Sequence, residues 1–351
     1  MPHLKEGKVP WSLLQTITKQ TGASNPGLIL GPGPGIDVAV VELSEARKQA
    51  QKFYTSSQDC YLVSKADPIT FPIANPAKHL IIINSNDIVT AGALPFGLSI
   101  TALLPPETPA SFIEELQQNL HTTCVSKNIS ILGGHTEVTD AISRPVLAGS
   151  MFGFVPRDYY VPRRFEIGDK IIFSGYVGAE GTGIIASEGR EVLKQHFTKS
   201  ELLEAEHIGS IDQLDIAKRV LDINKQFRPH AIHDVTEGGV LGAIYEFIQP
   251  SKLGASLERQ KFTITSITQK MASLLNFNPF HLIGSGAVLF VVETSHANFI
   301  ISTLRKHGFP ADIVGEITED PKITLDGQEL DPPSADDMII ALEELKTLKK
   351  G

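Results

Sequence analysis

Segments typical of strands and segments typical of helices alternate along the whole of this 351-residue chain. Short apolar runs such as residues 36–43 and 96–104 predict strands, and apolar residues spaced three to four apart predict helices between the strands. A polar, proline-broken segment, residues 156–164, interrupts the alternation near the middle of the chain. The sequence therefore predicts an α/β or α+β protein of two domains, residues 1–160 and 161–351.

The segment from Asn75 to Gly92 decides where two polar side chains lie. Four consecutive apolar residues, 80–83, favour a buried strand, whereas Asn-Pro at the start and Gly at the end are typical of a helix. We predict a helix, because the two end signals agree on a length of about four turns. A helix places Asn84 and Asp87 three residues apart on one face.

Composition limits the partners that the chain can bind. It carries 31 Lys and Arg against 40 Asp and Glu, a formal net charge of -9, with no dense basic run. Nucleic acids and anionic membranes bind through positive charge, so we expect neither as a partner. The apolar runs are far shorter than the ~20 residues of a spanning helix, and the N-terminus lacks a signal-peptide pattern. We therefore expect a cytoplasmic protein.

The chain has two cysteines, Cys60 and Cys124. This count excludes a disulfide scaffold and a cysteine-based structural zinc site. Cys124 falls near the apolar stripe of an expected helix, so it reads as a small core residue. Cys60 begins an expected strand and has no base close to it in the sequence. Neither cysteine is predicted to be a nucleophile.

Four acidic residues in the first half stand at the ends of expected elements: Asp37, Asp67, Asp87 and Glu137. Mg²⁺ prefers oxygen ligands and commonly binds through a few carboxylates together with phosphate oxygens. Each carboxylate taken alone also fits a turn residue or a helix cap. As a set, interleaved with glycine turns, they predict a metal site.

Two glycine-rich segments could approach a phosphate. Residues 31–35 alternate Gly and Pro and match neither a Walker loop nor a dinucleotide fingerprint, so a rigid turn and a phosphate contact are equally compatible with them. The second segment follows a short strand expected over residues 130–132 and contains Gly133, Gly134 and Thr136. It combines flexible backbone, a hydroxyl and an adjacent carboxylate, and we predict a phosphate-binding loop there.

A compact group of polar residues and glycines occupies the second half, from His233 to Gly239. It falls on an expected strand-to-helix transition, where glycines and helix N-terminal amides can face an anion. His233, next to Asp234, has the side chain for acid–base work. A structural histidine, with Thr236 as an ordinary helix cap, is the alternative interpretation.

These motifs, in this order, resemble the aminoimidazole-ribonucleotide synthase-like superfamily. That group includes thiamine-monophosphate kinase, selenophosphate synthetase and the hydrogenase expression/formation protein HypE, and the overall pattern is most similar to HypE. The resemblance runs from about Leu28 to Thr318. Its motifs are Gly35–Val40, Ala66–Pro68, Asn84–Pro95, Gly133–Glu137, His233–Gly239 and Gly284–Gly286.

The resemblance implies a fold and a cofactor set. In this superfamily the strands of an N-terminal α/β domain pair with those of a second subunit into a β-barrel, and a C-terminal α/β domain follows. ATP and Mg²⁺ bind in a cleft near the dimer interface. We therefore expect a homodimer whose first domain, residues 1–160, binds ATP and Mg²⁺.

The resemblance also assigns roles to individual residues. Those that match positions meeting nucleotide or Mg²⁺ are Asp37, Asp67, Asn84, Asp87, Gly133, Gly134 and Thr136. Glu137 is the further metal candidate, and Asp87, His233 and Asp234 are the expected catalytic residues, the last two near the second substrate.

Three departures from the family pattern bear on the reaction. Ile36 replaces the first of two adjacent aspartates, and His135 replaces the acid of the Gly-Gly-acid-Thr loop. The chain ends Lys349-Lys350-Gly351, whereas HypE proteins end in a cysteine that accepts a carbamoyl group.

The reaction expected from the resemblance is phosphoryl transfer from ATP to an amide-type oxygen or another acceptor, which can be a small molecule or a group borne by a protein. One alternative is a catalytically silent, dimeric maturation or scaffold protein. Another is a kinase that resembles thiamine-monophosphate kinase.

Overall fold

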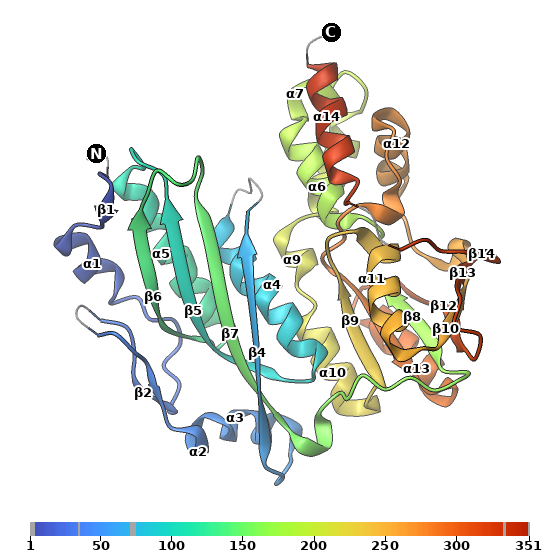
Figure 1. The fold of residues 1–351 in the computed structure, drawn as a ribbon, viewed down its shortest axis with the longest axis horizontal. Coiled ribbons are helices and arrows are strands. Elements are labelled where there is room, and N and C mark those ends of the chain that lie inside the picture. The colour runs from blue at the N-terminus through green and yellow to red at the C-terminus, as the bar shows by residue number, and fades with distance from the viewer. Residues whose placement is uncertain (1–3, 34–35, 71–74, 333–334, 350–351) are drawn as a thin grey trace. The chain divides into compact units, whose positions relative to one another are not determined.

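The structure is a computed structural model, and it describes residues 4–33, 36–70, 75–332 and 335–349 (Figure 1). The chain divides into two compact units, Met1–Tyr160 and Val161–Gly351. Each unit has a sheet of its own, and helices and strands alternate in both. The predicted mixed α/β architecture is therefore confirmed.

The first unit is built on a five-stranded sheet in the order β1-β6-β5-β7-β4. Only β5 and β6 run parallel; the other pairs are antiparallel. The sheet is open, with β1 and β4 at its edges, so the barrel across a dimer stays a prediction. The elements are β1 (Gly7–Lys8), α1 (Trp11–Ile17), β2 (Leu28–Leu30), β3 (Val40–Val41), α2 (Leu43–Ala46), α3 (Lys48–Tyr54), β4 (Cys60–Ile69), α4 (Pro76–Thr90), β5 (Leu94–Leu104), α5 (Ala110–Ser126), β6 (Ser130–Val138) and β7 (Val146–Pro156).

Helices α4 and α5 pack side by side, α4 against β4, β5 and β7, and α5 against β6. The segment that also fitted a strand is helix α4, as predicted. Its N-cap is Asn75, whose Oδ1 accepts a hydrogen bond of 3.0 Å from the Lys78 N–H, and Pro76 occupies the first turn. The four apolar residues that favoured a strand are buried because this helix is covered on nearly all sides.

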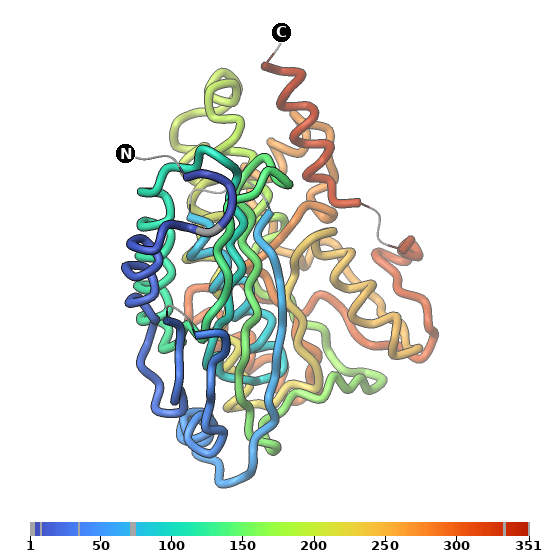
Figure 2. The backbone as a smooth tube through the Cα atoms, turned by 60° about the vertical axis from the view of Figure 1, so that its left-hand side comes forward, coloured from blue at the N-terminus to red at the C-terminus, as the bar shows by residue number. Residues whose placement is uncertain are grey.

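The opposite face of this sheet is partly covered by smaller elements. Phe96 and Phe154 form a cluster there with Ala46 and Ala50, which come from α2 and α3. Helix α1 lies beside α5 at the other end of the unit, a neighbourhood visible in both views (Figures 1 and 2).

Strand β6 does not end at the glycine pair, so the prediction of a loop there was wrong. Gly133, Gly134 and Thr136 lie inside β6, which continues parallel to β5 after a register shift. A Cβ on Gly134 would lie 1.8 Å from the Ile100 carbonyl oxygen, so the two strands can approach this closely only at glycine. The glycines therefore serve strand pairing as well as any ligand.

The second unit is built on a seven-stranded sheet in the order β14-β13-β10-β12-β8-β11-β9. Its strands are β8 (Lys170–Ser174), β9 (Ala231–Val235), β10 (Gly254–Leu257), β11 (Ala287–Val292), β12 (Ala311–Thr318), β13 (Ile323–Leu325) and β14 (Gln328–Glu329). Its helices are α6 (Ala179–Glu188), α7 (Arg190–Leu193), α8 (Lys199–Ile208), α9 (Ile211–Leu214), α10 (Ala217–Phe227), α11 (Gly239–Ile248), α12 (Ser266–Leu275), α13 (Thr294–Lys306) and α14 (Met338–Leu348).

Strand β11 lies in the middle of the second core. All six of its residues are buried, as expected of a strand covered on both faces of a sheet. Alternate residues of β11 pack with α11 in one cluster, and α13 contacts β8, which pairs with β11, and β12, which pairs with β8. The predicted strand-to-helix transition after His233 is confirmed as β9 followed by α11.

Within the described stretches, every helix is too short or too polar to cross a membrane.

Candidate functional site

Strand β4 and helix α4 bring two of the predicted metal ligands to one lysine. The Lys65 ammonium lies 3.3 Å from Asp87 Oδ1 and 3.9 Å from Asp67 Oδ2. Lys65 and Asp67 are two residues apart on β4, so they share the strand face that meets α4. Lys65 was not among the residues predicted from the sequence, although the alternation of side chains along a strand places it on the same face as Asp67.

Asn84 is fully buried next to this group. Its Nδ2 donates to the Leu80 carbonyl at 2.9 Å and to the Asp67 carbonyl at 3.3 Å. Its Oδ1 is buried without a hydrogen-bond partner among the described residues. Helix α4 can approach β7 here because position 149 is glycine: a Cβ there would lie 3.1 Å from Asn84 Nδ2. The close packing of α4 on β4 and β7 therefore holds Asn84 and Asp87 beside β4.

Four other predicted residues of the first unit line a cavity of about 720 Å³, and Glu137 is not among its lining residues. Strand β6 supplies Gly133, Gly134 and Thr136, and the segment before β3 supplies Asp37. The remaining wall is mainly apolar and comes from α1, α5, β5 and β6, with members that include Trp11, Leu14, Ile17, Ile113, Leu116, Leu120 and Ile131. A pocket of this size with few polar groups is typical of a small-molecule site.

His135 and Glu137 project from the same strand. His135 Nε2 lies 3.3 Å from Glu137 Oε2, and both side chains are about half exposed, at 55% and 45%. Pro32, Gly33 and Ile36 contribute to the cavity wall, whereas residues 34–35 of the glycine-proline segment lie outside the described residues.

The predicted ligands of the first unit thus form two groups. One group, Asp67, Asn84 and Asp87, lies at β4, and the other, with Gly133–Thr136, lies at β6. Two strands, β5 and β7, separate β4 from β6, so the groups are roughly 14 Å apart at the usual spacing between strands. Oxygen ligands reach Mg²⁺ at about 2.0–2.1 Å, so no single ion can bind both groups within one such sheet.

In the second unit, the half-buried His233 packs against the core. Its ring stacks on Phe247 of α11, with centroids 5.0 Å apart and planes at 25°. The Arg163 guanidinium covers the Phe247 ring 5.6 Å from its centroid. Asp234, the next residue on β9, is 6% exposed. The two expected catalytic side chains therefore alternate across the strand, and His233 faces the helix.

The N-terminus of α11 already has an anionic partner. The Gly238 N–H donates to Asp336 Oδ2 at 2.7 Å, and Asp336 Oδ1 accepts from the N–H groups of Met338 and Ile283 at 2.7 and 3.3 Å. Burial raises the pKa of Asp336. A carboxylate therefore occupies the position at which the sequence predicts an anion.

A second buried carboxyl lies nearby, on α6. Burial raises the pKa of Glu180, hydrogen bonds from Ser285 lower it, and the charge of Asp336 raises it further. Glu180 Oε2 is buried without a hydrogen-bond partner among the described residues. Neither carboxyl was predicted from the sequence, because the surroundings of each depend on contacts between distant segments.

The described part of the chain holds one group of three His, Cys, Asp or Glu side chains whose ligand atoms all lie within 4.8 Å of one another: Glu166, Asp169 and His230. Asp169 Oδ2 lies 2.8 Å from His230 Nδ1 and accepts the Glu166 N–H at 2.9 Å. These contacts explain the cluster as a turn before β8 that the buried Asp169 side chain stabilises.

Two domain families match this chain. Residues 35–155 match the N-terminal domain of AIR synthase related protein, and residues 166–328 match its C-terminal domain. The chain belongs to the AIR synthase related family. One of its relatives is the carbamoyl dehydratase HypE of Escherichia coli, which is 23% identical over 310 residues, or 86% of this chain and 88% of the relative.

Solved structures with the AIR synthase related fold are similar to the structure of this chain. A structure of the hydrogenase maturation protein HypE in complex with ATP covers 90% of this chain and 92% of its own, with a TM-score of 0.69 at 18% identity. A thiamine-monophosphate kinase from Stenotrophomonas maltophilia covers 94% and 100%, with a TM-score of 0.65 at 18% identity. The two-domain family fold is therefore confirmed.

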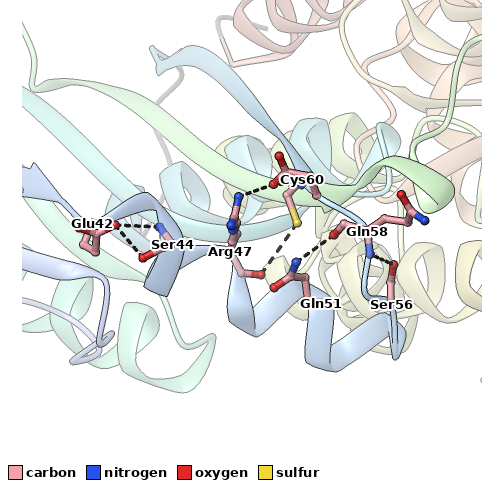
Figure 3. Close-up of polar contacts among 8 residues, drawn as sticks. Glu42, Ser44, Arg47, Gln51, Ser56, Gln58 and Cys60 are labelled. Atoms are coloured by element: carbon pink, nitrogen blue, oxygen red, sulfur yellow. Dashed lines mark hydrogen bonds and ion pairs between the residues drawn. The ribbon is translucent and has the colours of Figure 1, made fainter.

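Neither cysteine of this AIR synthase related chain is placed as a nucleophile. Cys60 Sγ lies 4.0 Å from the Arg47 carbonyl oxygen at the start of β4 (Figure 3), and burial raises the pKa of its thiol. Cys124 is fully buried, and burial raises its pKa to about 12. Because the thiolate is the nucleophile, both thiols are poorly suited to accept a carbamoyl group at neutral pH.

Proposed function

We propose that this protein is an ATP-dependent enzyme with a HypE-like maturation role, and that ATP binds in the cavity of the first unit. The observation that carries the proposal is the convergence of Asp37 with Gly133, Gly134 and Thr136 on one cavity of about 720 Å³. The apolar wall suits a nucleobase, and the exposed backbone of β6 with the Thr136 hydroxyl suits phosphate oxygens.

The reaction we propose is transfer of the terminal phosphoryl group of ATP to the oxygen of a carboxamide-type acceptor. The bond from the terminal phosphorus to the bridging oxygen breaks, a bond to the acceptor oxygen forms, and ADP leaves. The acceptor oxygen then departs as phosphate while the amide nitrogen loses two protons, which leaves a nitrile and amounts to dehydration. Positioning and neutralisation of charge supply most of such catalysis.

Mg²⁺ would neutralise charge on the phosphates when bound. Its donor set is divided in this structure: Asp37 lies at the cavity, whereas Asp67 and Asp87 are paired with Lys65. Asp37 is the carboxylate at the cavity that we expect to hold Mg²⁺ on the nucleotide, and Glu137 of β6 is the further candidate.

The acceptor, in this proposal, is carried by another molecule. Cys124 is buried and Cys60 is half-buried, and burial raises the pKa of both thiols. A small molecule or a group borne by a protein partner is therefore the expected acceptor. We further propose that two copies pair through the sheet of the first unit, where Leu62 is 57% exposed on edge strand β4.

Calorimetric titration with ATP and MgCl₂ tests the nucleotide site. We expect one site per chain, and Asp37→Asn should weaken binding on the order of tenfold, because it removes a carboxylate from the cavity. Asp140→Asn, which removes the same charge at an exposed turn, should bind as the wild type does. Absence of ATP binding to the wild type would overturn the proposal.

A second candidate function is a catalytically silent maturation or scaffold protein. The pairing of Lys65 with Asp87, one of the residues expected to act in catalysis, favours it. ADP release measured with carboxamide acceptors and with thiamine monophosphate separates the candidates. Turnover with a carboxamide supports the dehydratase-like reaction, turnover with thiamine monophosphate indicates a kinase, and ATP binding without turnover supports the silent role.

A further inference from the structure

The Asp67–Asp87 pair has the composition of a site for a hard divalent cation. Two carboxylates approach the same point from β4 and α4, with side chains 35% and 18% exposed. Asn84 adds an amide oxygen, Oδ1, which is buried and has no hydrogen-bond partner among the described residues, on the side chain whose Nδ2 contacts the Asp67 carbonyl. Carboxylate and amide oxygens are the ligands that Mg²⁺ and Ca²⁺ use in proteins.

The Lys65 ammonium lies between these two carboxylates, 3.3 Å from one and 3.9 Å from the other. It therefore faces the same oxygens that a bound divalent cation would need. A cation at that position would stand within a few ångströms of the ammonium, and like charges at that separation repel strongly where water is partly excluded. The Lys65 ammonium and a divalent cation would therefore compete for the same position beside Asp67 and Asp87.

We propose that Lys65 is a tethered cation that fills the Asp67–Asp87 site and keeps free divalent cations out of it. The proposal deepens the proposed function, since it concerns which cations serve the nucleotide-binding unit. The consequence is that a divalent cation that serves the nucleotide binds at the cavity, where Asp37 lies, and not at the Asp67–Asp87 site. A metal that the family fold would place at β4 is replaced here by a side chain of the protein.

The decisive experiment compares Mn²⁺ binding by the full-length wild type and Lys65→Met, without nucleotide, by electron paramagnetic resonance of the free ion. Methionine keeps most of the length of the lysine side chain and removes its charge. We expect Lys65→Met to bind one more Mn²⁺ ion than the wild type does. The affinity for Mn²⁺ at Asp67 and Asp87 should rise by at least on the order of tenfold over that of the wild type at the same position. Adding Asp87→Asn to Lys65→Met should abolish the additional site.

Lys48→Met is the matched control, because it removes a lysine that pairs with Glu45 at 2.6 Å elsewhere in the same unit. It should bind Mn²⁺ as the wild type does. The proposal is overturned if Lys65→Met gains no site over Lys48→Met, or if the wild type itself binds Mn²⁺ at a site that Asp87→Asn removes.

Two further measurements keep the result interpretable. If circular dichroism shows that Lys65→Met does not fold, Lys65→Thr replaces it as the variant that removes the positive charge. Lys65→Arg retains the charge, so it should still exclude Mn²⁺ from the site. A separate titration with ATP, read from the fluorescence of the single tryptophan, Trp11, at the cavity wall, tests the proposed function by itself. Loss of ATP binding and absence of the Mn²⁺ site are thereby distinguishable.

Discussion

The Asp336 carboxylate accepts a hydrogen bond of 2.7 Å from the backbone N–H of Gly238, at the first turn of α11. The same carboxylate accepts the N–H groups of Ile283 and Met338, so it joins three segments of the second unit. Gly238 has a positive φ of 81°, which directs its N–H toward this carboxylate at little conformational cost. The buried Asp336 side chain thus ties the start of α14 to two other segments of the second unit.

We expect Asp336→Ala to destabilise the protein by about 2 kcal/mol, because it leaves buried N–H groups without an acceptor. Denaturant unfolding followed by circular dichroism measures this loss. Asp331→Ala, which truncates an exposed aspartate of the same segment, should change stability by less than about 0.5 kcal/mol. Equal effects of the two variants would show that the Asp336 contacts contribute nothing.

Glu180 makes stability depend on pH. Its folded-state pKa is raised above the ordinary value of 4.5, chiefly by burial. A group with a raised folded-state pKa contributes stability that is present below pH 4.5 and is lost as the pH rises through the folded pKa. We therefore expect Glu180→Gln to gain stability relative to the wild type as the pH rises from 4.5 toward neutrality.

Denaturant midpoints of both proteins across this pH range test the expectation. Glu188→Gln, at the exposed end of the same helix, should follow the wild type at each pH. A constant difference between Glu180→Gln and the wild type would contradict a titration of Glu180.

Adjacent glycines of β6 should respond differently to substitution. In Gly134→Ala the new Cβ would lie 1.8 Å from the Ile100 carbonyl oxygen, so β6 must shift away from β5. We expect a loss of about 1–3 kcal/mol in stability and weaker ATP binding. At Gly133 a Cβ would meet nothing within 4 Å, so Gly133→Ala is the matched control for stability. Similar thermal unfolding of the two variants would contradict the close approach of the strands.

The two thiols should be slow to react in the folded protein. We expect labelling by a thiol reagent at pH 7 to be at least roughly tenfold slower than in denaturant, because burial disfavours both thiolates. Cys60→Ser combined with Cys124→Ala should also retain ATP turnover, if the acceptor is carried by another molecule. Loss of turnover in a folded double variant would instead assign a thiol to the reaction.

Local patterns predicted helix α4 correctly. Asn-Pro and Gly at the ends of residues 75–92 indicated helix α4, because caps depend on residues adjacent in sequence. The glycines of β6 were predicted to form a loop, since a glycine pair is typical of a turn. The close approach of Ile100 from a parallel strand explains why they lie in a strand, and that approach is a long-range contact.

The sequence by itself determined the mixed α/β class, the family and the residue types that could bind a nucleotide and a metal, because these follow from spacing and motif order. Only the tertiary structure decided which of those residues meet. It divided the carboxylates between β4 and β6, placed Lys65 between Asp67 and Asp87, and brought Asp336 to the turn at Gly238. Strand order and the docking of distant segments set these distances, and neither is encoded in the local pattern of residues.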